Sequence, residues 1–178
     1  MEVMLRCAVH DRPGALAELA GAIAGFGGDI QGVDVVESAD GQALDDLLVV
    51  IDAPQLSALL NNLEASDDVE VVHVGPSRGH PGDGVARLAV GFEALLTGAM
   101  APDHGVAALL SGLLRASSAD LVPAQDAPRA GERVLILAVD HRVLVLRRDY
   151  RFTRAERDRA AAVLAAGLAA AKAASSAT

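Results

Sequence analysis

The sequence predicts an α+β protein built from two domains. Apolar residues follow strand and helix periods in the order β-α-β-β-α-β over the first 75 residues, and a Gly/Pro-rich run, GPSRGHPGDG, comes next. Beyond that run the period is first helical, then strand-like, then helical again. We therefore expect a first domain at 1–75, a linker at 76–86, a second domain at 87–172 and a disordered tail at 173–178.

The first strand and helix have clear signals. Residues 2–10 alternate, so that one face of the strand carries Val3, Leu5, Cys7 and Val9, and we expect Cys7 to be buried. Apolar residues then recur at helical spacing, at Leu16, Leu19, Ala20, Ile23 and Phe26. Proline suits a first helical turn and glycine suits a helix end, so this helix is expected to begin at Pro13 and to end at Gly27-Gly28.

Two further strands and a second helix complete the first domain. Residues 30–38 and 44–51 are predicted strands joined by Ala39-Asp40-Gly41, because Asp-Gly is a hairpin signal. Pro54 is expected to begin the second helix, whose apolar stripe is Leu56, Leu59, Leu60 and Leu63. Residues 69–74 are the predicted fourth strand.

Both faces of this predicted sheet are apolar. The face toward the helices is expected to carry the first-strand residues together with Val33, Val35, Leu47, Val49 and Ile51. The opposite face carries Met4, Ala8, Leu48, Val50, Val72 and Val74. Such a face is too apolar to be left in water, so we expect a second domain or a second copy of the chain to cover it, and we predict a homodimer.

The second domain is predicted to combine helices with a short antiparallel sheet. Its first two helices carry Leu88, Phe92, Leu95 and Leu96, and then Val106, Leu109, Leu110 and Leu113. The segments ADLV, RVLILAV and RVLVLRR are strand-like, and Asp140-His141 joins the last two as a tight hairpin. Thr153 and Glu156 form a capping box that begins a terminal helix through Val163, Leu164 and Leu168.

Composition excludes several classes of function. The net charge of −9 and the 2% aromatic content argue against binding to nucleic acid or to anionic membranes. No secretory leader or membrane-spanning run is apparent, and one cysteine makes no intrachain disulfide, so we expect a cytoplasmic protein. His73, His80 and Asp83 do not have the spacing of metal ligands, and we expect neither a metal nor a cofactor.

The strand-helix junction DRPGALAELAGAIAGFGGDI resembles that of the ACT domain, a ligand-sensing module of amino-acid metabolism. Asp11, Pro13, Gly14 and Leu16 match its Asp-x-Pro-Gly-x-Leu pattern, and Gly28-Asp29-Ile30 matches the exit from its first helix. The resemblance implies a ferredoxin-like fold, pairing of two domains through their sheets, and an amino-acid site at the interface. The implied walls of the site are Asp11, Arg12, Pro13, Gly14, Ala15 and Leu16 on one side, and Gly28, Asp29 and Ile30 on the other.

The chemistry of these residues suits a zwitterion. N–H groups of Gly14, Ala15 and Leu16 would lie at a helix N-terminus, where an α-carboxylate is stabilised. Asp29 stands where the family commonly has Asn, and a carboxylate can only accept, so it favours an ammonium group. The alternative is that these glycines only permit tight packing between helix and sheet.

The second half resembles a truncated GAF domain. HRVLVLRRDYRFTRAERDRAAAVLAAGLA is similar to that family's closing strand and terminal helix, and LLRASSADLVPA is similar to its opening helix and first strand. The segment is too short for the family's central pocket, which implies a dimerising scaffold. Six arginines are interleaved with acids, so we expect a solvated helix face with local ion pairs at Arg147, Arg148, Arg151, Arg154, Arg157 and Arg159.

No pattern in the sequence indicates catalysis. The glycine-rich GAIAGFGG ends a helix, whereas a dinucleotide site needs glycines that open one. We therefore expect a non-catalytic regulatory protein that binds an amino acid and acts through dimer or partner contacts. Two alternatives remain open at this point: a regulatory subunit of an amino-acid biosynthetic enzyme, and a dimerising scaffold without a ligand.

Overall fold

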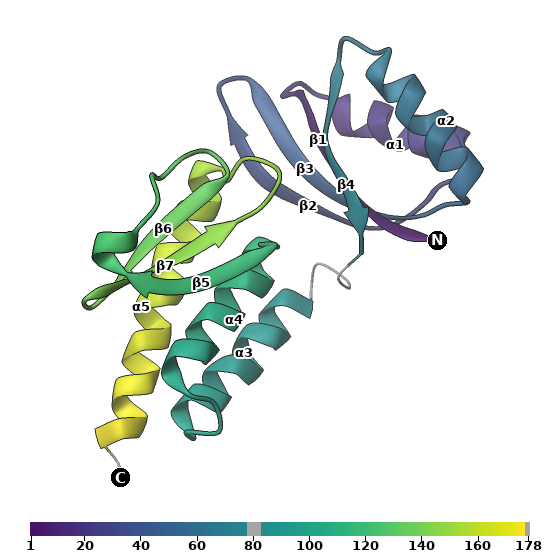
Figure 1. Cartoon of the computed structure of the whole chain (residues 1–178). Coiled ribbons are helices and arrows are strands. Elements are labelled where there is room, and N and C mark those ends of the chain that lie inside the picture. Colours follow the sequence, from purple (N-terminus) through teal and green to yellow (C-terminus); the bar gives the residue numbers. More distant parts are fainter. Residues whose placement is uncertain (78–82, 177–178) are drawn as a thin grey trace. The chain divides into compact units, whose positions relative to one another are not determined.

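The chain consists of two compact units, Met1–Asp83 and Gly84–Thr178 (Figure 1). The computed structural model describes residues 1–77 and 83–176. Helix begins at Asp83, inside the expected linker 76–86. Residues 173–176 of the expected disordered tail are helical, and residues 177–178 lie outside the described residues. Alanine has the highest helix propensity, and Ala170 and Ala171 are buried, which favours helix in the last turns of α5 up to Ser176.

The first unit is a four-stranded antiparallel sheet with two helices on one face (Figure 1). Its elements are β1 (Glu2–His10), α1 (Ala15–Gly25), β2 (Asp29–Ala39), β3 (Gln42–Val50), α2 (Ala53–Glu64) and β4 (Val69–Pro76). The strand order β2-β3-β1-β4 leaves β2 and β4 at the two edges. The predicted β-α-β-β-α-β order and the ferredoxin-like fold are confirmed.

The core of this unit lies between the sheet and its helices. Cys7 is fully buried there, as predicted, together with Leu19 and Ile23 of α1 and Leu59 and Leu63 of α2. Burial and the neighbouring Asp45 and Asp46 raise the pKa of the Cys7 thiol to about 12. The hairpin between β2 and β3 turns at Asp40 and Gly41, which both have positive φ, the conformation of a type I′ turn.

Three valines of the first unit differ from the prediction, two in their exposure to solvent and one in the face of the sheet on which it lies. Val33 and Val35 pair with Leu47 and Asp45 on the helix side, but they stay 41% and 54% exposed because β2 is an edge strand. Val74 was expected on the opposite face and instead packs against the core, since a register shift where β4 pairs with Arg6 and Cys7 moves the strand by one residue.

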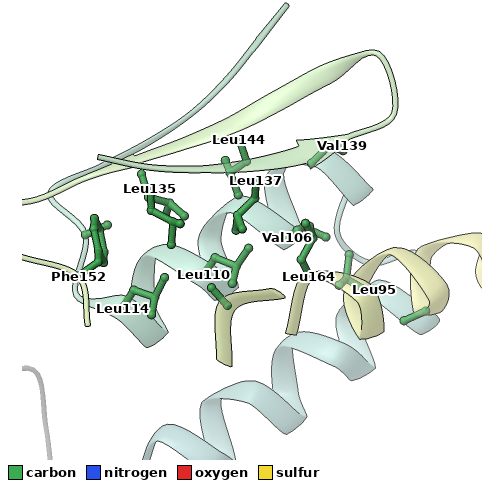
Figure 2. Close-up of a cluster of buried hydrophobic side chains, with 14 residues drawn as sticks. Leu95, Val106, Leu110, Leu114, Leu135, Leu137, Val139, Leu144, Phe152 and Leu164 are labelled. Carbon is green, nitrogen blue, oxygen red and sulfur yellow. The ribbon is translucent and has the colours of Figure 1, made fainter. Parts of the chain in front are cut away.

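The second unit has a three-stranded sheet with helices packed on one face (Figure 1). Its elements are α3 (Asp83–Leu96), α4 (Pro102–Leu114), β5 (Ser118–Pro123), β6 (Val134–Val139), β7 (Arg142–Arg147) and α5 (Arg154–Ser176), with a short 3-10 turn at Ala124–Asp126. The strand order is β5-β7-β6. Figure 2 shows Leu110 and Leu114 of α4 lying beneath Leu135 and Leu137 of β6 in an aliphatic core closed by Phe152.

Arg148 is not part of a solvated face, contrary to the sequence-based expectation. Its guanidinium is buried and donates to both carboxylate oxygens of Glu156 and to the carbonyls of Leu114, Tyr150 and Arg151. The capping box is confirmed, because Thr153 Oγ1 accepts from the Glu156 N–H at 3.1 Å and Glu156 accepts from the Thr153 N–H at 2.8 Å. Glu156 therefore both caps α5 and neutralises Arg148.

Candidate functional site

The turn that begins α1 carries the first wall of the expected site. Gly14 is the N-cap residue and has φ +94°, a left-handed conformation, so the helix begins at Ala15 and not at Pro13. A Cβ on Gly14 would meet only Glu18 Oε1, at 3.9 Å. Glycine is therefore required by the backbone conformation, and the space beside it is open.

Hydrogen bonds hold this turn against the end of the sheet. The Asp11 N–H donates to the Gly41 carbonyl at 2.8 Å, and Asp11 Oδ2 accepts from Ser38 Oγ at 2.6 Å. Arg12 donates to both carboxylate oxygens of Glu18, at 2.9 and 2.7 Å. That hydrogen-bonded pair raises the pKa of Arg12 and lowers the pKa of Glu18.

Backbone donors at the start of α1, among them those of Gly14 and Leu16, remain open in the described residues. The Ala15 N–H donates to the Arg12 carbonyl at 3.2 Å, which closes the turn. Within the described parts of the chain, no acceptor contacts the N–H groups of Gly14 and Leu16, and no side chain caps the helix. These donors lie at the positive end of the helix dipole, where a carboxylate is stabilised.

The second expected wall lies where α1 ends. The N–H groups of Gly27 and Gly28 donate to the carbonyls of Ala24 and Ile23, which is the Schellman pattern. A Cβ on Gly28 would lie 2.6 Å from Ile23 Cγ2 and 3.1 Å from Val49 Cγ1, so this glycine does permit close packing of helix on sheet. Asp29 is exposed and accepts a hydrogen bond from Gln31, and Ile30 packs against the core.

The structure does not bring the two walls together within one chain. Asp29 is in register with Val50, which pairs with Glu2 at one end of β1, whereas Asp11 follows His10 at the other end. Nine residues of strand span about 27 Å, far more than an amino acid covers. A site that uses both walls needs a second copy of the domain.

Two hollows lie near His10 and the end of α2, and the smaller one adjoins the first wall. One, of about 100 Å³, is lined by Arg12, Ala15 and Glu18 of the turn and by Asn62 and Asp68. The other, of about 370 Å³, is lined by residues that include His10, Glu64 and Glu70. His10 Nδ1 lies 3.7 Å from Asp68 Oδ1, with both side chains largely exposed.

Sequence reasoning missed Asp45, a buried carboxylate on the helix side of β3. It pairs with Cys7 of β1 and Val35 of β2, is 2% exposed, and its Oδ1 has no hydrogen-bond partner in the described residues. Burial raises its pKa, and the charges of Asp46, Asp11 and Asp34 add to the effect. The signal was present in QALDDLLVV, because two adjacent carboxylates in an apolar strand must point to opposite faces.

Residues 1–77 and 83–176 contain no cluster of three side chains that could hold a metal ion. His73 lies in β4, whereas His80 and the side chain of Asp83 are outside the described residues. No described helix is both long and apolar enough to span a bilayer.

Comparison with known families fits the geometry of the first unit. Residues 3–68 match the family model of the ACT domain. These residues form an ACT domain. ACT domains are regulatory modules that bind small molecules, so the match supports a ligand-binding regulatory role for this part of the chain. The resemblance of the second unit to a GAF domain stays a prediction.

The chain is also similar to solved structures. The ACT domain from GTP pyrophosphokinase of Chlorobium tepidum is 20% identical, with a TM-score of 0.35, over 42% of this chain and 95% of that one. The ligand-free regulatory subunit of aspartate kinase from Thermus thermophilus is 12% identical, with a TM-score of 0.37, over 95% of this chain and 91% of that one. No curated protein matches the chain.

Proposed function

We propose that this protein is a non-catalytic regulator that binds an amino acid through its ACT domain. The observation that carries the proposal is the open start of α1, where the N–H groups of Gly14 and Leu16 have no acceptor in the described residues and the space beside Gly14 is empty. An α-carboxylate supplies the missing acceptor and gains from the helix dipole. The one thiol, Cys7, is buried and unpaired, in keeping with a cytoplasmic location.

The proposal includes a homodimer in which two chains build each site. β2 is an edge strand whose Val33 and Val35 are exposed, so it offers both unpaired backbone groups and apolar side chains to a second copy. A two-fold axis beside β2 would pair it antiparallel with β2 of the second copy. Residue 29 of one copy would then lie near residue 39 of the other. Residue 39 is next to Ser38, whose hydroxyl donates to Asp11 of the Asp11–Leu16 turn. This arrangement brings the Gly28–Ile30 segment of one chain to the Asp11–Leu16 turn of the other.

Ligand binding is tested by thermal shift with each of the twenty standard amino acids. A binder at a hundred times its Kd stabilises the fold by about 2.7 kcal/mol. Gly14→Asn should abolish the shift, because asparagine tolerates the left-handed conformation and fills the space that the ligand needs. Gly98→Asn is the matched control, since Gly98 has φ +70° and open space beside it and belongs to the second unit, away from both walls in sequence.

The alternatives give different results in the same screen. If no amino acid shifts the melting temperature of the parent chain, a scaffold without a ligand is the better description. A regulatory subunit of a biosynthetic enzyme would instead co-purify with a larger catalytic chain. The dimer itself is tested by light scattering on Val35→Lys, which should give a monomer if β2 forms the interface.

A further inference from the structure

The free edge of β2 carries two exposed valines with an acid between them. β2 pairs regularly with β3 from Gly32 to Val35, between two register shifts. Val33 and Val35 stay exposed on the face of the sheet that the helices cover. Asp34 lies between them, opposite Asp46 of β3, so its side chain is on the other face. A second copy that pairs with this edge meets both features.

The valines select one register for an antiparallel pair of β2 strands. Directly opposite residues in such a pair point to the same face, so the two-fold axis passes beside a residue that faces its own copy. An axis at Asp34 sets Val33 of each copy against Val35 of the other, and all four valines become covered. An axis at either valine would set the other one against Gln31 or Glu37. The axis at Asp34 therefore buries the most apolar side chains, and it is the one that brings residue 29 near residue 39.

The same register brings the two copies of Asp34 face to face. Opposite residues of an antiparallel pair have Cα atoms about 4.5 to 5.5 Å apart, and like charges in that position are destabilising. Asp34 is exposed, and no hydrogen bond or ion pair holds its carboxylate within the described residues. Its charge is therefore free to act on the charge of the second copy.

The residue that follows Asp34 in its row across the sheet is another acid. The row continues through Asp46 of β3 and Arg6 of β1 to His73 of β4. Arg6 donates to both carboxylate oxygens of Asp46, at 2.7 and 2.8 Å. The guanidinium is thus two strands away from Asp34 and is hydrogen-bonded to the acid between them, so it neutralises the facing pair only weakly.

We propose that the two-fold axis of the homodimer passes beside Asp34, and that the facing carboxylates of the two copies limit the affinity of the dimer. This inference rests on the homodimer of the proposed function and specifies its register and regulation. Apolar contact between the valines holds the copies together, and charge repulsion at the axis opposes it. Because an amino-acid site with both walls needs two copies, ligand binding shifts the equilibrium toward the dimer most when the unliganded dimer is weak.

The affinity of the dimer is measured by analytical ultracentrifugation on the full chain without a ligand. Asp34→Asn should tighten the dimer by about threefold or more at about 0.01 M NaCl, because it removes the repulsion and keeps the shape. Asp67→Asn is the matched control, since Asp67 is an exposed acid between α2 and β4 and its replacement changes the net charge equally. About 1 M NaCl shortens the Debye length from about 30 Å to about 3 Å, so it should bring the parent chain close to Asp34→Asn.

The register is tested by disulfide cross-linking of single-cysteine replacements. Asp34→Cys should form a covalent dimer on oxidation, because facing residues lie within the Cα separation of about 4.4 to 6.8 Å that a disulfide needs. Val33→Cys is the control, because residue 33 would be displaced from its own copy by two residues, about 7 Å along the strand, in addition to the spacing between strands. It should cross-link far more slowly. Cys7 is buried and is present in both variants.

The outcomes separate this inference from the homodimer itself. Equal affinities of Asp34→Asn and Asp67→Asn, or cross-linking of Asp34→Cys no faster than that of Val33→Cys, would overturn the register and the role of Asp34, while the homodimer would still stand if Val35→Lys gives a monomer. A dimer that survives Val35→Lys, or a parent chain and an Asp34→Asn variant that both remain monomeric, would overturn the homodimer through β2 and this inference with it.

Discussion

Each unit of this protein contains a buried arginine paired with a carboxylate, and the two pairs stabilise different things. In the ACT domain, Arg6 Nε donates to Asp46 at 2.7 Å across neighbouring strands, and the pair is confined to one face of the sheet. In the second unit, Arg148 joins β7 to α5 through Glu156 and also holds the last turn of α4 through the Leu114 carbonyl. Its guanidinium lies 4.1 Å from the ring centroids of both Tyr150 and Phe152.

The comparison shows that a buried arginine–carboxylate pair can have two different structural roles. The Arg6–Asp46 ion pair satisfies two side chains that the strand register already places opposite each other. The Arg148 guanidinium also donates to the backbone carbonyls of Leu114, Tyr150 and Arg151, so it connects elements distant in sequence. Two intrinsic probes separate the units, because Tyr150 is the only tyrosine and Cys7 the only cysteine of the chain.

The largest expected effect comes from removing Arg148. Arg148→Leu leaves Glu156 buried without a counter-charge and three carbonyls without their donor, so it should lower the free energy of unfolding of the second unit by about 3 to 5 kcal/mol. Urea unfolding followed by Tyr150 fluorescence measures it. Arg147→Leu, which removes an exposed pair with Asp120, should cost less than about 1 kcal/mol. Equal costs for the two variants would contradict the connecting role.

The second effect contrasts double replacements in the two units. Arg6→Met alone should cost about 3 kcal/mol, and Arg6→Met with Asp46→Leu should recover most of that loss, because well-packed apolar groups replace a buried pair at little cost. Arg148→Met with Glu156→Leu should not recover, since Leu114, Tyr150 and Arg151 still lose a donor. Urea-dependent alkylation of Cys7 reports the first pair and Tyr150 fluorescence the second. Recovery in both units would mean that the two pairs are equivalent.

A smaller loss of stability is expected when the capping box at Thr153 and Glu156 is broken without removing the charge of Glu156. Thr153→Ala removes one half of the capping box and leaves the Arg148 pair intact, and it should cost about 1 kcal/mol by Tyr150 fluorescence. Thr97→Ala provides the control, because the Thr97 hydroxyl donates only to exposed carbonyls at the end of α3. A cost near that of Arg148→Leu would show that cap and ion pair act as one unit.

The smallest expected effect is a gain in stability when Asp45 is replaced. Asp45 is the sequence neighbour of Asp46 and, unlike Asp46, has no arginine partner among the described residues. The raised pKa of Asp45 means that the folded chain keeps a proton which the unfolded chain releases from about pH 4 upward, so stability falls as the pH rises through that window. Asp45→Asn should remove this loss, raising the melting temperature at pH 7.5 and leaving it nearly unchanged at pH 4. The pKa of Cys7 is raised to about 12, so its thiol stays protonated over this range and does not contribute to the difference. An equal gain at both pH values would exclude the carboxyl as its source.

The sequence by itself determined the α+β class, the order of elements and most of the core. Period-2 apolar patterns and turn residues act locally, so the β-α-β-β-α-β order, the Asp40-Gly41 hairpin, the burial of Cys7 and the Thr153–Glu156 capping box were all predictable. The Asp-x-Pro-Gly-x-Leu junction likewise identified the ACT domain before the fold was known.

Tertiary structure alone decided which polar groups are buried together and where the site walls lie. In the sequence Arg148 looks like part of a solvated arginine run, because only the tertiary fold places the first turn of α5, with Glu156, beside the end of β7. A register shift in β4 moved Val74 to the other face of the sheet, and the strand order placed Val33 and Val35 on an edge strand. The alternation of apolar residues along a single strand reveals neither feature. The two predicted walls are twelve or more residues apart in sequence and occupy opposite ends of the sheet, since the length of β1 separates them.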